Sequence, residues 1–309
     1  MLFLGEMAGI GTSFFWSFTS IYFSEAGKLI GSFNVNKIRL AMAALIYTII
    51  LTSLHGSPIP ENVNYTQLYW LGLSGLIGLF FGDACGFKAL VMIGPRLTTL
   101  IYAVTPVITT LIAWIFLGEV LSLYDLTGIA VTISGITWVV AHRKFSRQQV
   151  FSTDGDHPDK GSLFKGIMLG LGAALGQAVG LVLAKKGIMF SGSEMNPMDA
   201  SFIRIIFAMV GIWLLSGMRS NKVTLIEILR NKKAMVYSFG GAVFGPFLGV
   251  WSSLIAVKYL ETGVASTLNS LTPVMILPIL VLYYKQEVPL RAWLGAIIAI
   301  AGIAIIFLG

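Results

Sequence analysis

The chain has 309 residues, of which 56% are hydrophobic and 11% are charged, and its mean hydropathy is +0.84. A soluble protein carries about a quarter charged residues, so this composition excludes an ordinary soluble enzyme and predicts an all-α integral membrane protein. The net charge of +7 does not predict a nucleic-acid partner, because the Lys and Arg residues lie in short stretches between apolar segments, as membrane orientation requires.

Continuous apolar segments predict ten transmembrane helices. A helix needs roughly 20 residues to cross the bilayer core of about 30 Å. The first segment is interpreted as such a span and not as a secretory signal, because no basic stretch precedes it and no small-residue cleavage site follows it. The predicted spans are residues 3–24, 35–54, 68–92, 96–117, 122–141, 163–184, 198–217, 235–257, 262–284 and 290–308.

The second half of the sequence repeats landmarks of the first at one fixed shift. Thr105-Pro106-Val107 returns 167 positions later as Thr272-Pro273-Val274, and four glycines shift with it: Gly78, Gly82, Gly128 and Gly135 return as Gly245, Gly249, Gly295 and Gly302. This predicts two five-helix units, at 1–143 and 163–309, joined by a polar linker at 144–162. Because five is odd, the units would be inverted relative to each other, an arrangement typical of secondary transporters with a site between the halves. Duplication for stability alone is the alternative.

The distribution of Lys and Arg predicts the orientation. The loops after the first, third, fifth, seventh and ninth spans, with the adjoining helix ends, carry 17 of the 21 Lys and Arg residues. Cytoplasmic loops carry the excess of basic residues. We therefore expect both termini to lie outside the cytoplasm.

Each predicted unit has the same three features. Its second span has an arginine near its start, its fourth span contains a proline and ends near a glutamate, and its fifth span contains Gly-x6-Gly. The residues are Arg39, Pro106 and Glu119 in the first unit and Arg204, Pro273 and Glu287 in the second. With these features the whole chain resembles a ten-helix member of the drug/metabolite transporter superfamily built from two EamA repeats. The resemblance implies transport of a small molecule; ten-helix relatives usually have cytoplasmic termini, which differs from the Lys and Arg count.

Asp83 is the one acidic residue predicted to lie near the middle of a span. Ionisable residues within membranes usually face the bundle interior or a water-filled cavity. Asp83 is therefore a candidate for proton coupling or cation binding. The alternative is a buried carboxylate satisfied by Lys88, Arg39 or neighbouring hydroxyls.

The fourth span carries a polar face. Thr98, Tyr102, Thr105 and Thr109 follow one another at spacings of four, three and four, which places them on one side of a helix. The repeat maps Tyr102 and Thr105 onto two polar residues, Asn269 and Thr272. We expect these matched positions to line a substrate cavity, with interhelical hydrogen bonding as the alternative.

Other mid-span residues are weaker candidates. Trp16 aligns approximately with Gln177, and Trp251 lies at a similar depth; all three are candidate cavity residues, with ordinary packing as the alternative for the two tryptophans. Pro106 and Pro273 are expected to kink their helices and to serve either as hinges or only to set the shape. Arg39 and Arg204 lie near helix starts, so snorkelling to the interface is expected and binding of a substrate anion is the alternative.

Together these features predict a secondary active transporter, an exporter of a small metabolite across the cytoplasmic (inner) membrane by alternating access, with proton coupling as one possibility. The alternative is a non-transporting sensor or a membrane-embedded enzyme. We expect no enzymatic activity, catalytic residue, metal or cofactor, because the three histidines have no metal-ligand spacing and Cys85 is the lone cysteine. The expected partners are a small-molecule substrate and the lipid bilayer, and a homodimer is left open.

Overall fold

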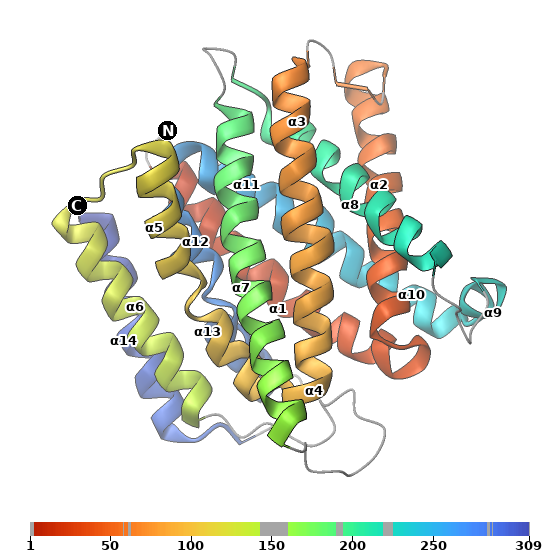
Figure 1. Cartoon of the computed structure of the whole chain (residues 1–309). Coiled ribbons are helices and arrows are strands. Elements are labelled where there is room, and N and C mark those ends of the chain that lie inside the picture. Colours follow the sequence, from red (N-terminus) through yellow and green to blue (C-terminus); the bar gives the residue numbers. More distant parts are fainter. Residues whose placement is uncertain are drawn as a thin grey trace.

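The computed structural model describes residues 3–57, 59–60, 63–142, 160–189, 194–218, 225–282, 285 and 287–308. All regular structure in these residues is helical (Figure 1). Most of the linker predicted at 144–162 lies outside the described residues.

The helices of the two halves follow one another in the same order. In the first half they are α1 (Leu4–Ile30), α2 (Ser32–His55), α3 (Tyr65–Ser74), the π-helix η1 (Gly75–Gly82), α4 (Asp83–Tyr102), α5 (Thr105–Leu117) and α6 (Leu123–His142). In the second half they are α7 (Lys160–Ile188), α8 (Pro197–Met218), the short α9 (Leu225–Arg230), α10 (Lys232–Ala242), the π-helix η4 (Val243–Gly249), α11 (Val250–Tyr259), α12 (Thr262–Asn269), α13 (Thr272–Leu282) and α14 (Leu290–Leu308). The N- and C-termini lie at the same end of the bundle (Figure 1).

Nine helical segments within the described residues are long and apolar enough to cross a membrane. They are Ser32–His55, Tyr65–Gly94, Leu97–Leu117, Leu123–His142, Leu163–Ile188, Pro197–Gly217, Lys232–Tyr259, Thr262–Leu282 and Leu290–Phe307. They correspond to nine of the ten predicted spans. The remaining helix, α1, has 27 residues, but buried hydroxyl residues such as Thr12, Ser13 and Ser17 make it less apolar. The span predicted at 3–24 therefore stays a prediction.

Glycines bring the first helix of each half against the third span of the other half. On α7, a Cβ atom added to Gly176 would lie 2.8 Å from the Cα of Gly82, and one added to Gly180 would lie 2.9 Å from the Cα of Gly78. Backbones approach this closely in membranes where small residues face each other. In the same way α1 lies against η4, where a Cβ on Gly245 would be 2.7 Å from Thr19. Each half therefore packs its first helix against the third span of the other half.

The fifth spans, α6 and α14, pack along each other at one side of the molecule (Figure 1). A Cβ on Gly135 would lie 2.3 Å from the backbone nitrogen of Ala299, and one on Gly302 would lie 2.4 Å from the hydroxyl of Thr132. Apolar residues of α6, α12 and α14 surround this contact and form one core cluster. Together α6 and α14 make a second glycine-dependent contact between the halves.

The fourth span of each half is broken. In the first half α4 ends at Tyr102 and α5 begins at Thr105; in the second half α12 ends at Asn269 and α13 begins at Thr272. The prediction that Pro106 and Pro273 kink a continuous helix is therefore corrected. Each proline lies in the first turn of a new helix, where its missing N–H removes no helical hydrogen bond.

Candidate functional site

A cavity of about 610 Å³ lies between the two halves. Its polar and aromatic lining comes from both halves of the chain: Thr12, Trp16, Thr19, Ser20, Phe23, Glu25, Lys28, Arg39, Asp83, Phe87, Thr98, Thr99, Tyr102, Thr105, Gln177, Arg204, Ser253, Ser266, Asn269, Ser270 and Thr272. The lining reaches the C-terminal end of α1, where Lys28 and Glu25 form a partly exposed ion pair with a distance of 2.6 Å. The cavity therefore extends from the centre of the bundle to this end.

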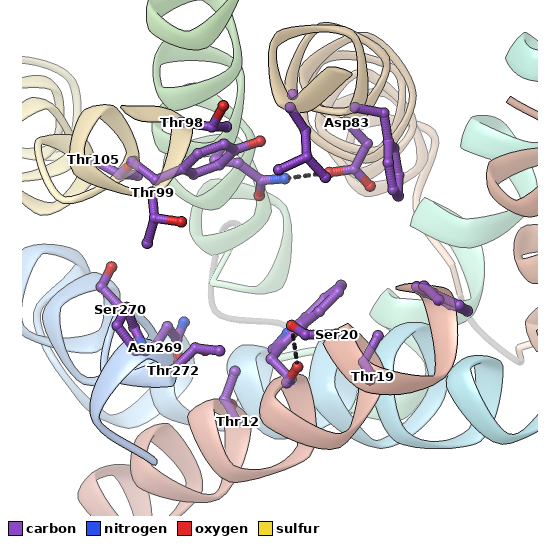
Figure 2. Close-up of a pocket in the computed structure, with 18 of the residues that line it drawn as sticks. Thr12, Thr19, Ser20, Asp83, Thr98, Thr99, Thr105, Asn269, Ser270 and Thr272 are labelled. Carbon is purple, nitrogen blue, oxygen red and sulfur yellow. Dashed lines mark hydrogen bonds between the residues drawn. The ribbon is translucent and has the colours of Figure 1, made fainter. Parts of the chain in front are cut away.

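Asp83 begins α4, directly after η1, and two neighbouring helices hold its carboxylate. Arg39 of α2 forms an ion pair with Oδ2 of Asp83. From α7, the side-chain nitrogen of Gln177 donates a hydrogen bond of 2.7 Å to Oδ1 (Figure 2). The Nε of Arg39 donates a second bond, of 2.7 Å, to Asn36.

This arrangement decides two points that the sequence left open. Arg39 is 2% exposed and Asp83 is 8% exposed, so the expectation that Arg39 snorkels to the interface is corrected. For Asp83 the structure shows the alternative of a buried carboxylate satisfied by Arg39. A buried carboxylate is tolerated when it is paired and hydrogen-bonded in this way.

Arg204 of α8 is the second buried arginine at the cavity. It is 2% exposed, so the expectation that it snorkels to the interface is also corrected. Its Nε is buried and makes no hydrogen bond to any residue that the structure describes. The backbone of α8 fixes it there, because a Cβ on Gly75 of η1 would lie only 2.2 Å from the carbonyl oxygen of Arg204. The arginine is thus held at the cavity wall and away from the membrane surface.

The breaks in the two fourth spans face each other across the cavity. Thr98, Thr99 and Thr105 lie on one side, and Asn269, Ser270 and Thr272 lie on the other (Figure 2). Asn269 donates a hydrogen bond of 2.8 Å to Ser253. The carbonyl oxygen of the Asn269 side chain and the hydroxyl of Thr105 are buried without a hydrogen-bond partner among the described residues. The breaks thus supply polar atoms that a bound molecule could use.

The sequence also matches the model of a known protein family. A family model described as the EamA-like transporter family matches residues 3–141 and, a second time, residues 164–308. The chain belongs to the EamA-like transporter family. Each match contains one copy of the Thr-Pro-Val sequence and one broken fourth span.

The fold of this EamA-like chain also has a solved counterpart. A structure titled "Crystal structure of protein" superimposes with a TM-score of 0.74, covering 99% of this chain and 97% of the other, at 14% sequence identity. At that identity the likeness shows the fold alone. None of the curated proteins compared with the chain matches it.

The other predicted site residues of the EamA-like chain are placed as follows. Trp16 and Tyr102 line the cavity. Trp251 is not among the lining residues; it stacks on Phe247, with ring centroids 6.3 Å apart, within a core cluster. The preceding residue, Val250, lines the cavity, and one residue along a helix turns the side chain by about 100°. Trp251 is therefore turned away from Val250 and packs against Phe247.

The hydroxyl of Thr109, from the predicted polar face, lies 3.1 Å from that of Ser266 on α12. This residue therefore makes an interhelical hydrogen bond, the alternative that the sequence had left open for this face.

Sequence reasoning missed the polar side of α1. Thr12, Trp16, Thr19 and Ser20 line the cavity from this helix (Figure 2). Their spacings of four, three and one place them on one helical face, so the signal was present. Of these four residues, only Trp16 was predicted to line the cavity.

A polar cluster closes the bundle at the end opposite Lys28. Glu119, just after α5, forms an ion pair of 2.7 Å with Lys185 of α7. Its carboxylate also accepts hydrogen bonds from the backbone nitrogen (2.7 Å) and the hydroxyl (2.8 Å) of Thr262 at the start of α12. Leu260, beside this cluster, packs against Gly5 near the N-terminus of α1. The cluster therefore joins the two halves at the N-terminal end of α1.

Within the part of the chain that the structure describes, no three His, Cys, Asp or Glu residues are grouped so as to hold a metal ion. The chemistry that the cavity offers is therefore ion pairing, hydrogen bonding and aromatic contact.

Proposed function

We propose that this EamA-like protein is a secondary active transporter that moves a small metabolite across the cytoplasmic membrane by alternating access. The observation that carries the proposal is the cavity between the halves, which reaches one end of the bundle while the Glu119 cluster joins the halves at the other end. A transporter in one of its two end states has this asymmetry. The family match supports a transporter in general.

The same proposal includes ten transmembrane helices arranged as two inverted repeats. In support, the π-helices η1 and η4 end at Gly82 and Gly249, which the sequence repeat relates to each other. The broken fourth spans also match across the halves. With both termini outside the cytoplasm, as the Lys and Arg residues predict, the cavity of this state opens toward the cytoplasm. That orientation suits the loading step of an exporter.

Within this proposal the substrate contacts Trp16, Asp83, Tyr102, Thr105, Gln177, Asn269 and Thr272, all of which line the cavity. The half-helices that begin near Pro106 and Pro273 tilt about their breaks and so serve as hinges. Asp83 couples transport to protons: a proton on its carboxylate would cancel the ion pair with Arg39 and loosen the contact between α2 and α4.

Transport into proteoliposomes tests the proposal. Purified protein is reconstituted with and without a pH gradient and offered radiolabelled amino acids, nucleosides, amphipathic cations, aromatic carboxylates and phosphate esters. We expect at least one class to accumulate, and to do so faster with the gradient. A protein that moves none of these solutes in either direction would contradict the transport function.

A further inference from the structure

Arg204 differs from Arg39 in forming no ion pair with an acidic residue that the structure describes. Both arginines are 2% exposed, both line the cavity, and each lies near the beginning of the second helix of its half. Arg39 pairs with Asp83 and donates to Asn36. Arg204 makes no ion pair within the described ranges, and its Nε makes no hydrogen bond there. A buried charge is costly unless something pairs with it.

The sequence repeat shows why the partner is missing. Asp83 is the first residue after η1, and Val250 is the first residue after η4. The repeat relates these two positions, and both line the cavity. The chain therefore provides a carboxylate for the arginine of the first half and an apolar residue where the second half would need one.

Neighbouring groups do not supply the missing negative charge. The carboxylate of Asp83 lies close enough to attract Arg204, but it makes its ion pair with Arg39 and its hydrogen bond with Gln177. The hydroxyl of Tyr47 donates to the carbonyl oxygen of Phe247 at 2.9 Å. The charged residues of the lining are Glu25, Lys28, Arg39, Asp83 and Arg204, which leave one positive charge.

We propose that the substrate of this cavity carries one anionic oxygen group, a carboxylate or a phosphate ester, that pairs with Arg204. The inference rests on the proposed transport function and names its substrate class. A guanidinium suits this role because its planar set of N–H donors matches two oxygens of a carboxylate or phosphate. Trp16, Phe23, Phe87 and Tyr102 surround the same space and fit an apolar or aromatic body on the same molecule.

Stability measurements test the unpaired charge without knowledge of the substrate. Arg204→Met keeps an apolar stem of similar length and removes the charge. We expect the melting temperature of the purified protein in detergent to stay equal or to rise, because the variant loses a buried charge that has no partner. The matched control, Arg39→Met, should melt at a lower temperature, because it leaves Asp83 without its cation. A loss of stability in Arg204→Met as large as that in Arg39→Met would overturn the proposal.

Binding measurements test the ligand. Phenylacetate, phenyl phosphate and the neutral phenylacetamide are titrated while tryptophan fluorescence is followed, since Trp16 lines the cavity. We expect at least one anion to bind about tenfold or more tightly than the amide, the scale of a charged hydrogen-bonded pair. Comparison of the two anions distinguishes a carboxylate site from a phosphate site. Arg204→Met should remove the preference, and Val250→Asp should remove it too by placing a carboxylate beside Arg204.

The outcomes separate this inference from the proposed function. Wild-type protein that binds neither anion at the solubility limit, or an Arg204→Met variant that keeps the preference for an anion, would refute the anion site. Anion binding through Arg204 without any flux in proteoliposomes would refute transport and leave the site standing. Flux of neutral solutes with no preference for anions would refute the substrate class alone.

Discussion

The pair of Arg39 and Asp83 is the contact in which single residues matter most. Both side chains are buried, and Gln177 and Asn36 complete their hydrogen bonds. Such a pair adds little over an apolar pair of the same volume, yet loss of one member leaves a charge without compensation. Replacement of either residue therefore leaves the charge of the other buried and unpaired.

Asp83→Asn should show this dependence. The amide keeps the size of the side chain but leaves the charge of Arg39 unpaired, so we expect the protein to lose about 3–5 kcal/mol of stability. If Asp83 couples transport to protons, accumulation driven by a pH gradient should disappear while exchange of substrate across the membrane persists. Thermal melting and paired uptake and counterflow assays measure the two effects.

The double variant Asp83→Asn with Arg39→Gln is the control for stability. It should melt closer to the wild type than Asp83→Asn alone, because no charge is left buried. If the Asp83→Asn variant takes up substrate at the wild-type rate and still responds to the pH gradient, the coupling proposal is refuted. Asp83 is then only a structural partner of Arg39.

The fourth span of each half was predicted as one kinked helix, and in the structure it consists of two helices. The positions of Pro106 and Pro273 were visible in the sequence, but a proline fits both a kinked helix and the first turn of a new one. The structure restarts the helix at Thr105 and Thr272. Local pattern could not choose, because the choice depends on the facing helices and the cavity between them.

Replacement of the prolines tests the proposed hinges. Pro106→Ala and Pro273→Ala restore an N–H and let the two half-helices join, so we expect slower transport with stability changed by about 1 kcal/mol or less. Initial rates of uptake measure the effect. Pro278→Ala is the matched control, because Pro278 lies inside α13 and away from the break; it should leave the rate unchanged. Equal rates in all three variants would remove the hinge role.

Nine of the predicted spans are helices long and apolar enough to cross a membrane. Apolar length alone located them, since the bilayer thickness fixes that length. The structure places Asp83, Tyr102, Thr105, Asn269 and Thr272 in the lining of one cavity. The repeat relates Tyr102 to Asn269 and Thr105 to Thr272, whereas the position that matches Asp83 is Val250. The match of Asp83 to Val250 was visible in the sequence, but the pairing of Arg39 with Asp83, which leaves Arg204 without such a pair, was only one alternative there. The packing of Trp251 against Phe247 was not predictable, since it depends on how neighbouring helices are rotated.

The whole molecule is asymmetric along its long direction. The cavity reaches the C-terminal end of α1, and Glu119, Lys185 and Thr262 join the halves near the N-terminal end. The Glu25–Lys28 pair lies within α1, whereas Glu119 joins the end of α5 to α7 and α12. Alternating access would require the Glu119 cluster to separate.

Glu119→Ala should therefore favour the state that opens at the N-terminal end of α1. The reporter is Ser266→Cys, at a residue that lines the cavity, placed in a Cys85→Ser background because Cys85 is the only native cysteine. A membrane-impermeant thiol reagent added at that end should label it several-fold faster when Glu119 is replaced. Glu25→Ala, which breaks the partly exposed pair at the other end, should not raise the rate. No increase with Glu119→Ala would show that the cluster does not limit opening.

The orientation of the whole molecule in the membrane can be tested with reporter fusions. The Lys and Arg count predicts that a reporter active only outside the cytoplasm gives signal when it is fused after Gly309 and stays silent when inserted within 145–160. The opposite pattern would show that the protein has the cytoplasmic termini usual for the ten-helix relatives it resembles.

The exchange of first helices between the halves has a consequence for biosynthesis. Gly78 and Gly82 of η1 meet their packing partner only when α7 has been made, and α1 waits for η4 until most of the chain is in the bilayer. When synthesis of the first half is complete, the helices that pack against η1 and α1, namely α7 and η4, have not yet been made. Until then, the helices of the first half stay in the lipid without these contacts. A first half expressed alone could complete this packing only against the corresponding helix of another molecule.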